Sequence, residues 1–509
     1  MLDYLEFTSK EKSMLIAPAG FGKTHTIAEC LKYTYDQGKQ LILTHTHAGV
    51  ASIKEKIKKE GIPNSSYHIE TITSFAQKYV QSFYTGTDIH AQEDSKNYYP
   101  FILEKAIELF KLKPIRRIVL VSYKGLFVDE YQDCTIEQHA LIQSISELFP
   151  TRVLGDYLQG IFGFKGETLV NMNDLNQFSE YTSFKLETPW RWIKGENEIL
   201  GQNLVSIRDL LEKNEPIDLV NFKSVIEIHK MKKSNEFLEF EIKDASGNKI
   251  NNPLNKVIWD LKKESSLLII YPNDDKNKNS APRELFIKRF GDDFKLLEAI
   301  DDKDFYKLSV TFDNTTPQKI EADIMKLLYK CFTKKSIGYW FISSLNNSTE
   351  LMKFKPIISN IEKLKVEINR GLIGETLRLI SSLPYMKCFR KDLFRSISFA
   401  LSEAEINKIT VHDAMINKRN SVRRIGRKVI GKCVGTTLLT KGLEFDTVVI
   451  VNAHDFDCPK HLYVALTRAS KRLIIFTADT LLKPYKTNTL KTTWDSNSGS
   501  ELLLWQFYD

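Results

Sequence analysis

The sequence lacks several features that would place it in a specialised class of protein. Its six cysteines are widely scattered and form no C-x-x-C pair, which argues against a disulfide framework or a zinc finger. No apolar run approaches the roughly 18 residues of a membrane span, and the first segment, MLDYLEFTSKEK, carries acids where a signal peptide carries bases. The positive surplus is only +8, too small for a polycationic tail but enough for a basic groove. We therefore expect a soluble cytoplasmic protein with no membrane partner.

The length and apolar content are ample for more than one buried core. At about 100 to 200 residues per domain, 509 residues predict two to four domains. Two stretches combine short apolar runs, ending in Gly, Asp or Thr, with helical periodicity, which is typical of α/β cores with parallel sheets. The expected strands are 13–17, 40–46, 126–130 and 151–156 in the first core, and 266–273, 447–455 and 471–479 in the second.

Helical periodicity also predicts an insertion in each core. The segments KIEADIMKLLYKCF and GETLRLISSL place apolar residues three and four apart, as in helices that bury one face. Residues 222–260 are expected to form a hairpin with its turn near Gly247. The predicted division is a first core at 1–75 and 118–190, a small helical insertion at 76–117, a second core at 191–305 and 430–509, and a reduced helical insertion at 306–429.

Residues 14–24, MLIAPAGFGKT, have the layout of a phosphate-binding loop. A strand leads into a Gly-rich turn, and a helical run follows Lys23 and Thr24. Gly20 and Gly22 let the backbone wrap phosphates, Lys23 meets the β and γ charges, and the Thr24 hydroxyl is suited to Mg²⁺. The alternative is an ordinary turn. The first position of the general pattern is Ala17 and not Gly.

The segment LFVDEYQD ends an expected buried strand with two adjacent acids. Asp129 is placed to hold the Mg²⁺ shell together with Thr24, and Glu130 to polarise the attacking water as a general base. A helix cap is the other interpretation of such a pair. The two segments together predict an NTP site in which Mg²⁺ is the cofactor.

Four further segments follow in a recognisable order: VLGDYLQGIFGFKG (153–166), TPWRW (188–192), TTLLTKGLEF (436–445) and LYVALTRA (462–469). Together with APAGFGKT and DEYQD, they resemble the motifs of superfamily 1 DNA helicases of the UvrD, Rep and PcrA type. The resemblance implies an α/β fold with two RecA-like P-loop cores, each carrying a mainly helical insertion. It also implies an NTP-driven translocase and helicase on single-stranded DNA, with ATP as the usual substrate and 3′ to 5′ polarity.

The same resemblance implies catalytic roles beyond the phosphate loop. Gln159 of GDYLQ is expected to sense the γ-phosphate and to link the site to DNA. Arg191 of PWRW and Arg468 of ALTRA are expected to reach across the cleft, where guanidinium groups suit the charge on a γ-phosphoryl group in its transition state. Each arginine could instead make a surface salt bridge.

The nucleotide itself is expected to contact residues of both cores. Trp190 stands where the family has a Tyr that stacks on the base, and Glu444 where it has a ribose contact; for Trp190 the alternative is plain core packing. The full set implied by the resemblance is Ala19, Gly20, Phe21, Gly22, Lys23, Thr24, His25, Trp190, Gly442 and Glu444.

For DNA, the resemblance implies a single strand that crosses the tops of both cores. Phe162 and Phe164 of GIFGFKG match the base-stacking aromatics, and Lys165 is a nearby phosphate partner. Both rings could instead belong to the core. LTHTHAGVASIKEKI and TITSF resemble the first DNA-contact motifs, although Thr and Ser there could simply cap helices. These two segments offer Thr44, Thr46, Thr71, Ser74 and Phe75.

The stretch KRNSVRRIGRKVIGK (418–432) is the densest positive run in the chain. It could clamp phosphates where DNA enters the second core, or it could be a solvated helix face. The composition does not decide between these two.

Several positions depart from the family pattern. No Gln occurs before Gln37, whereas the family has an adenine-reading Gln upstream of the loop, so GTP or deoxynucleotides stay open as alternatives to ATP. Pro18 and Phe21 replace a Gly and a Ser of the loop, and Pro189 and Leu438 replace an Asn and a His. These changes put the linkage between hydrolysis and DNA movement in doubt.

The reduced insertions leave two hypotheses for the function. One is a motor that moves along single-stranded DNA and unwinds duplex. The other is a nucleotide-gated sensor of DNA ends or single strands that controls a partner. Size and motif texture also resemble the helicase subunit of Gabija-type antiviral systems, which implies a nuclease partner.

Overall fold

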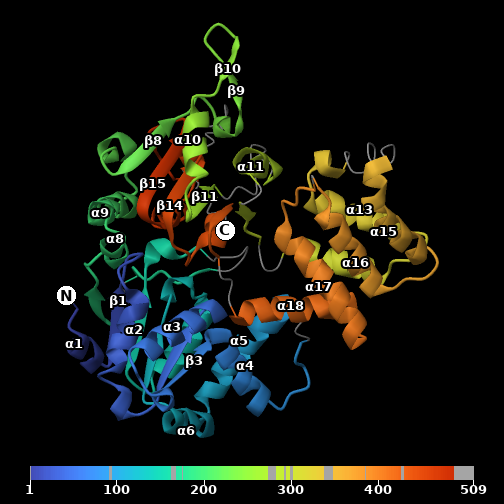
Figure 1. Cartoon of the computed structure of the whole chain (residues 1–509). Coiled ribbons are helices and arrows are strands. Elements are labelled where there is room, and N and C mark those ends of the chain that lie inside the picture. The colour runs from blue at the N-terminus through green and yellow to red at the C-terminus, as the bar shows by residue number, and fades with distance from the viewer. Residues whose placement is uncertain are drawn as a thin grey trace, which may run out of the picture.

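The computed structural model describes residues 2–90, 95–161, 168–174, 176–272, 283–291, 294–298, 302–337, 348–384, 386–425 and 429–485. Two six-stranded parallel sheets form separate cores, and a helical body lies beside them (Figure 1). This α/β architecture agrees with the expected pair of RecA-like cores.

The first sheet has the order β3-β2-β4-β5-β1-β6, and all neighbours are parallel. Its inner strands are short, apolar and buried on both faces, as a parallel sheet covered by helices requires. The strands are β1 (Lys12–Ile16), β2 (Gln40–Thr44), β3 (Tyr67–Thr71), β4 (Gly125–Val128), β5 (Thr151–Gly155) and β6 (Thr182–Lys185).

Helices cover both faces of this sheet. Alternate strand residues point to opposite sides, so Leu15 and Ile42 pack with α1 to α3, whereas Met14 and Leu43 pack with α4 to α7. The helices are α1 (Tyr4–Ser9), α2 (Lys23–Leu31), α3 (His47–Lys59), α4 (Ile72–Phe83), α5 (Ser95–Lys111), α6 (Lys113–Ser122) and α7 (Ile136–Ser146).

The second sheet has the order β12-β13-β11-β14-β15-β8, again with parallel neighbours. Helices α9 and α20 pack on one face, and α10 and α11 pack on the other. The strands are β8 (Ile226–Lys230), β11 (Leu267–Tyr271), β12 (Lys295–Leu296), β13 (Lys432–Thr436), β14 (Phe445–Val451) and β15 (Ala469–Thr477). The helices are α8 (Trp190–Lys194), α9 (Glu198–Glu212), α10 (Leu254–Leu261), α11 (Arg283–Phe290), α19 (Thr437–Thr440) and α20 (Pro459–Leu466).

The prediction of a hairpin over 222–260 is wrong for its first strand. β8 joins the second sheet at its edge, parallel to β15, because its apolar residues have a buried face to cover there. The antiparallel pair instead consists of β9 (Glu241–Lys243) and β10 (Lys249–Asn251), which project from the core as a small arm (Figure 1). The turn does lie at Gly247, whose φ of 84° favours glycine. A second short pair joins β7 (Ile217–Asp218) to β16 (Leu481–Leu482).

The helical body is built from the segment between β12 and β13 and has its own apolar core. Helix α18 packs within this body and also against α3 of the first core (Figure 1). The helices are α12 (Lys303–Asp313), α13 (Ile320–Cys331), α15 (Ser348–Leu364), α16 (Arg370–Ser382), α17 (Lys391–Asn407) and α18 (Val411–Ile425).

All six cysteines carry free thiols, as their scattered positions predicted. Among the described residues, no helix has the length and apolar content that crossing a membrane requires.

Candidate nucleotide-binding cleft

The Gly-rich turn connects β1 to α2 and is pressed against α8. Gly20 and Gly22 have φ values of 79° and 95°, a region that favours glycine. A Cβ added at Gly20 would lie 2.8 Å from Arg191 Cβ, and one added at Gly22 would lie 3.2 Å from Trp190 Cδ1. Both positions therefore need glycine, for backbone conformation and for space.

A buried cluster of charge lies at the start of α2. Lys23 is only 8% exposed, and its Nζ donates to Glu130 Oε2 at 2.9 Å. Glu130 follows β4 with a φ of 56°, an uncommon conformation for a residue with a side chain that is typical of functional sites. Asp129 is 3% exposed, and its Oδ1 has no hydrogen-bond partner among the described residues.

The two adjacent acids have opposite electrostatic surroundings. Burial, followed by the charge of Glu130, raises the pKa of Asp129 to about 6. Burial alone would also raise the pKa of Glu130, but the charges of Lys23 and Lys441 and the hydrogen bonds from Lys23 and Gln132 lower it below its ordinary value. Glu130 is therefore held as a carboxylate.

The donor set fits a magnesium ion. Asp129 Oδ1 is a buried carboxylate oxygen that lacks a partner among the described residues, and Thr24 lies on the first turn of α2 beside Lys23. Hard cations such as Mg²⁺ prefer oxygen ligands of this kind. Thr24 and Asp129 are thus the residues that would hold the ion.

Gln159 is aimed by an aspartate of its own segment. Its Nε2 donates to Asp156 Oδ2 at 2.7 Å, and Asp156 is fully buried. The backbone N–H of Asp156 donates to Gln132 Oε1 at 2.9 Å, and Gln132 Nε2 in turn donates to Glu130 Oε2. The amide expected to sense the γ-phosphate is therefore connected to the expected general base.

Lys441 is a cleft residue that the motif reading missed. It belongs to TTLLTKGLEF of the second core, yet its Nζ is paired with Asp133 of DEYQD and donates to the Gln159 carbonyl oxygen at 2.5 Å. The side chains of both ion-pair partners are buried, being 6% and 1% exposed. The only signal in the sequence is a lysine inside a motif.

The two arginines lie close together in the second core's part of the cleft. Arg191 Nε donates to Glu444 Oε2 at 2.7 Å, and its Nη1 donates to the Thr467 carbonyl oxygen. Arg468 is 1% exposed; burial, and then the charge of Arg191, lowers its pKa to about 9. The surface salt bridge considered for Arg468 is thus wrong.

Arg468 is held by backbone groups of its own core. Its Nε donates to the Val464 carbonyl oxygen at 2.9 Å and its Nη1 to that of Leu443 at 3.2 Å. The neighbouring Gly442 has a φ of 80° and open space around its Cα. The expected contacts of Arg468 and Gly442 with nucleotide stay predictions.

A pocket of about 320 Å³ opens beside the phosphate loop. Phe21, His25 and Trp190 line it, together with residues of the N-terminal helix and of the segment after β6. Trp190 is 40% exposed, so core packing is the wrong interpretation for it. Its neighbour Trp192, which is 1% exposed, occupies the core instead.

The expected DNA-contact residues divide into buried and exposed ones. Phe75 is fully buried against Tyr79 and Phe110, so its ring is not available to DNA in this structure, and the expected DNA contact of this side chain is wrong. Thr44 is 1% exposed. Thr46 is exposed and caps α3 by accepting from the backbone N–H of Gly49.

Thr71 and Ser74 form a helix cap, which is the alternative considered for them. Thr71 Oγ1 accepts from the Ser74 backbone N–H at 3.0 Å and donates to Ser74 Oγ at 2.7 Å. Phe162, Phe164 and Lys165 lie outside the described residues.

Part of the basic stretch belongs to the helical body. Arg419 is 5% exposed and its guanidinium lies 3.9 Å from the centre of the Phe305 ring. Lys418 Nζ lies 4.3 Å from the Phe399 ring centre. Neither interpretation of the stretch, phosphate clamp or solvated face, accounts for Arg419.

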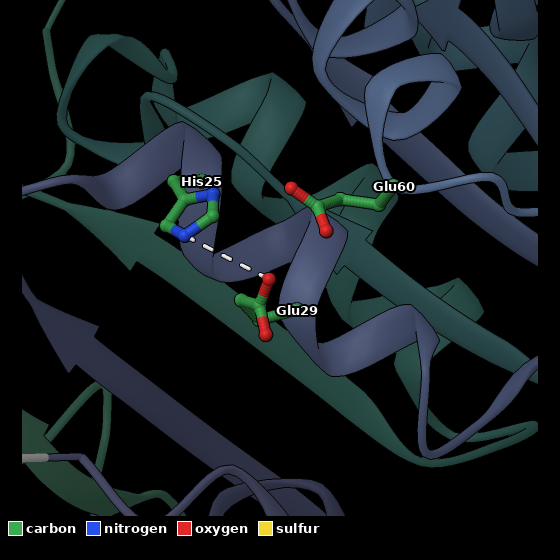
Figure 2. Close-up of side chains that lie close together, drawn as sticks. All are labelled: His25, Glu29 and Glu60. Atoms are coloured by element: carbon green, nitrogen blue, oxygen red, sulfur yellow. Dashed lines mark ion pairs between the residues drawn. The ribbon is translucent and has the colours of Figure 1, made fainter.

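A second group of potential metal ligands lies on the outer side of α2. His25 and Glu29 project from this helix toward Glu60 (Figure 2), and their ligand atoms lie within 4.8 Å of one another. Lys32 Nζ, however, is 2.7 Å from carboxylate oxygens of both Glu29 and Glu60. Because this lysine already balances the carboxylates, the group carries no metal assignment.

Comparison with known proteins gives matches in both cores. Residues 5–165 match a family described as an AAA domain, and residues 381–477 match the viral superfamily 1 RNA helicase core domain. The Gabija protein GajB of Bacillus cereus (strain VD045) is 21% identical over 394 residues, which cover 74% of this chain and 68% of the relative.

A solved structure, the complex of the Arterivirus nonstructural protein 10 helicase with DNA, is 10% identical with a TM-score of 0.33. The match covers 93% of this chain but only 64% of that one. The family matches on both sides of the cleft, together with the motifs placed there and the similarity to the Gabija protein, support a superfamily 1-type helicase.

Proposed function

We propose that the chain is an ATP-driven translocase on single-stranded DNA that unwinds duplex in the manner of UvrD, with 3′ to 5′ polarity. The observation that carries the proposal is the buried cluster of Lys23, Asp129 and Glu130 beside the arginines Arg191 and Arg468. Phosphoryl transfer needs positioning and charge neutralisation, and this cluster supplies both.

Lys23 links phosphate binding to activation of the base. Its ammonium neutralises Glu130, and the β- and γ-phosphates of a bound NTP compete for the same ammonium. Once released, Glu130 accepts a proton from the attacking water, because its carboxylate is already ionised. Mg²⁺ held by Thr24 and Asp129 would neutralise part of the phosphate charge.

The other cleft residues orient the nucleotide. The indole of Trp190, at the mouth of the pocket, stacks on the base, and Glu444 exchanges its contact with Arg191 for the ribose. Arg191, so released, turns to the γ-phosphate, where Arg468 stabilises the charge of the transition state. His25 lines the same pocket and contacts the nucleotide from its edge.

Single-stranded DNA crosses the first core past Thr46, and Phe162, Phe164 and Lys165 stay the proposed stacking and phosphate contacts. The division of the chain into two cores with insertions at 76–117 and 306–429 also stays a proposal. We place the activity in the cytoplasm.

The test measures strand release and NTP hydrolysis on duplexes with a 3′ or a 5′ tail. Lys23→Ala should lower DNA-stimulated hydrolysis about 100-fold or more, because the phosphate charge loses its buried partner. Lys32→Ala, on the outer side of the same helix, is the matched control and should hydrolyse normally. Normal hydrolysis by Lys23→Ala would refute the site.

The polarity and the chemistry of the single-stranded tail test the two remaining parts of the proposal, the 3′ to 5′ direction and the choice of DNA over RNA. Release of only 3′-tailed duplex supports the polarity, and release of only 5′-tailed duplex contradicts it. A duplex with an RNA tail is included because one matching family is named for RNA helicases. Preference for that tail would overturn the DNA assignment.

The similarity to a Gabija protein favours a second candidate, a DNA-end or single-strand sensor that regulates a partner nuclease in phage defence. In that case DNA stimulates hydrolysis, but no strand is released even at high protein concentration. If a nuclease is encoded next to the gene, mixing the two proteins should then change DNA cleavage in an NTP-dependent way.

A further inference from the structure

A buried arginine outside all recognised motifs joins the two cores beside the phosphate loop. Arg208, on α9, is 6% exposed. Its Nη1 lies 2.5 Å from Asp156 Oδ1 and 3.1 Å from the Tyr463 hydroxyl, and its Nη2 lies 2.6 Å from Glu212 Oε1. Asp156 follows β5 of the first sheet, whereas α9 packs with the second. The guanidinium thus spans the boundary between the cores.

Tyr463 extends this path to the phosphate loop itself. It lies on α20, is 2% exposed, and its hydroxyl oxygen accepts from the backbone N–H of Ala19 at 3.2 Å. The Arg208 guanidinium also lies over its ring, 5.3 Å from the centre. The Tyr463 hydroxyl of the second core is therefore hydrogen-bonded to a backbone amide of the phosphate loop in the first core.

The other end of the path reaches the expected general base. Asp156 Oδ2 accepts from Gln159, and the Asp156 backbone N–H donates to Gln132, which bonds Glu130. Asp156 Oδ2 accepts from Gln159, whereas Oδ1 accepts from Arg208 and from the backbone N–H of Leu158. Rotation of Asp156 by either partner moves the other, because fully buried groups have no water to replace a lost bond.

We propose that Arg208 is a positioning residue that couples the seating of the second core on the phosphate loop, through Tyr463, to the orientation of Gln159, through Asp156. The inference rests on the proposed NTP hydrolysis at this cleft. When the second core is seated, Tyr463 meets Ala19, and Arg208 fixes Asp156 with the Gln159 amide aimed. When the cores separate, the bond to Ala19 is lost and Gln159 is released.

Tyr463→Phe is the decisive variant, because it keeps the ring and the Arg208 to Asp156 ion pair and removes only the bridging hydroxyl. We expect kcat for DNA-stimulated hydrolysis to fall about tenfold, because one hydrogen bond that helps to keep Gln159 in position is lost. KM for the NTP should change less than about twofold, since the base pocket and Lys23 are untouched. Tyr485→Phe, which removes an exposed hydroxyl that donates to the Glu215 carbonyl oxygen and contacts neither Asp156 nor the phosphate loop, is the matched control.

Arg208→Lys provides the second measurement. A lysine keeps the charge but lacks the planar set of guanidinium donors that bonds Asp156, Tyr463 and Glu212 at once. The kcat should therefore fall again, with KM little changed. The double variant with Tyr463→Phe should be no slower than the slower single variant, because both remove the same path. Additive losses would contradict a shared path.

The outcomes separate this inference from the function on which it rests. If Tyr463→Phe keeps the wild-type kcat while Lys23→Ala is inactive, the coupling role of Arg208 is refuted and the NTP site stands. If the wild-type protein hydrolyses no NTP, the proposed function fails first. A purely structural role would lower the melting temperature of the Tyr463→Phe protein and leave kcat of the folded protein unchanged, which also overturns the proposal.

Discussion

Asp129 and Glu130 are neighbours in the chain, yet, within the part of it that the structure describes, only the carboxylate of Glu130 has a cationic side chain bonded to it. Glu130 has Lys23 at 2.9 Å, whereas Asp129 Oδ1 has no bonded partner among the described residues. The ionised form of Asp129 therefore costs folding free energy that only a bound cation or a proton relieves.

Asp129→Asn should stabilise the protein while it abolishes hydrolysis. The pKa of Asp129 is raised from an ordinary value of 3.8 to about 6, so the folded state binds the proton more tightly than the unfolded state. Stability is therefore lost as the pH rises through this window, and the neutral amide avoids the loss. We expect a gain of about 3 kcal/mol above pH 7 that shrinks as the pH falls toward 4.

Thermal melting across this pH range, with Mg²⁺ and nucleotide left out, checks the prediction. Asp446→Asn is the control, since that carboxylate is largely exposed beside Lys471 and should shift little. A gain for Asp129→Asn that is independent of pH would show that the carboxylate is not the cause.

Sequence motifs predicted the charged residues that meet in the cleft, but not the residues that hold them in place. Lys23, Asp129 and Glu130 are recognisable because each motif is a strand followed directly by its own loop, β1 for Lys23 and β4 for the two acids. Arg208 has no such signal, because its partners Asp156 and Tyr463 are distant in sequence and meet only when the cores pack. Burial also overruled the pattern at Phe75, which a motif match placed on DNA.

At the scale of elements, α8 shows how one short helix serves both the core and the site. It places Trp190 at the mouth of the pocket and Trp192 in the interior, two residues apart and in opposite surroundings. The Trp192 ring also packs edge-on against Phe21 of the phosphate loop at 6.2 Å.

Exchanging each tryptophan for alanine should therefore give different defects. Trp190→Ala should raise KM for the NTP about tenfold or more through the loss of base stacking, worth about 1 to 3 kcal/mol, with little change in stability. Trp192→Ala should instead destabilise the protein by about 3 to 5 kcal/mol, because it empties a buried site. Steady-state kinetics and urea unfolding of both variants decide the matter, and equal stability losses would contradict the assignment of Trp190 to the pocket.

The sequence patterns missed strands that have no continuous apolar run and are recognisable only from their place in the sheet. β3 (YHIET) has polar residues at its edge position, and β13 (KCVGT) contains Gly435, which packs against Leu297. β8 was assigned to a hairpin, because alternation of apolar residues reveals a strand without revealing its partner. The sequence did predict the apolar inner strands, because a strand that is buried on both faces is a continuous apolar run, which can be recognised without knowing its neighbours. These strands are β1, β2, β4, β5, β11, β14 and β15.

At the scale of the whole molecule, Lys441 ties the second core to the first. It is paired with Asp133 in a buried position. Burial lowers the pKa of Lys441 and raises the pKa of Asp133, and the charge of the partner opposes both shifts only in part. An unpaired charge left at this boundary costs far more than an exposed one.

Lys441→Met should destabilise the protein by about 3 to 5 kcal/mol, because it leaves the Asp133 carboxylate buried without its cation. Adding Asp133→Asn should restore part of the loss, and the two single effects should not be additive. Urea unfolding measures the cycle, and Lys471→Met, which removes an exposed pair with Asp446, serves as control within about 0.5 kcal/mol. A Lys441→Met protein as stable as the control would show that the pair does not hold the cores together.

The arrangement of the second sheet determines the order in which the parts of the molecule can fold during synthesis. Its central strand β11 lies between β13 and β14, and the whole helical body separates it from both along the chain. During synthesis the ribosome releases β11 long before either neighbour, whereas the first sheet is complete once β6 has emerged. The first core and then the helical body can each fold as they leave the ribosome. The nascent second core must wait for β15, and it closes last, on a first core that is already formed.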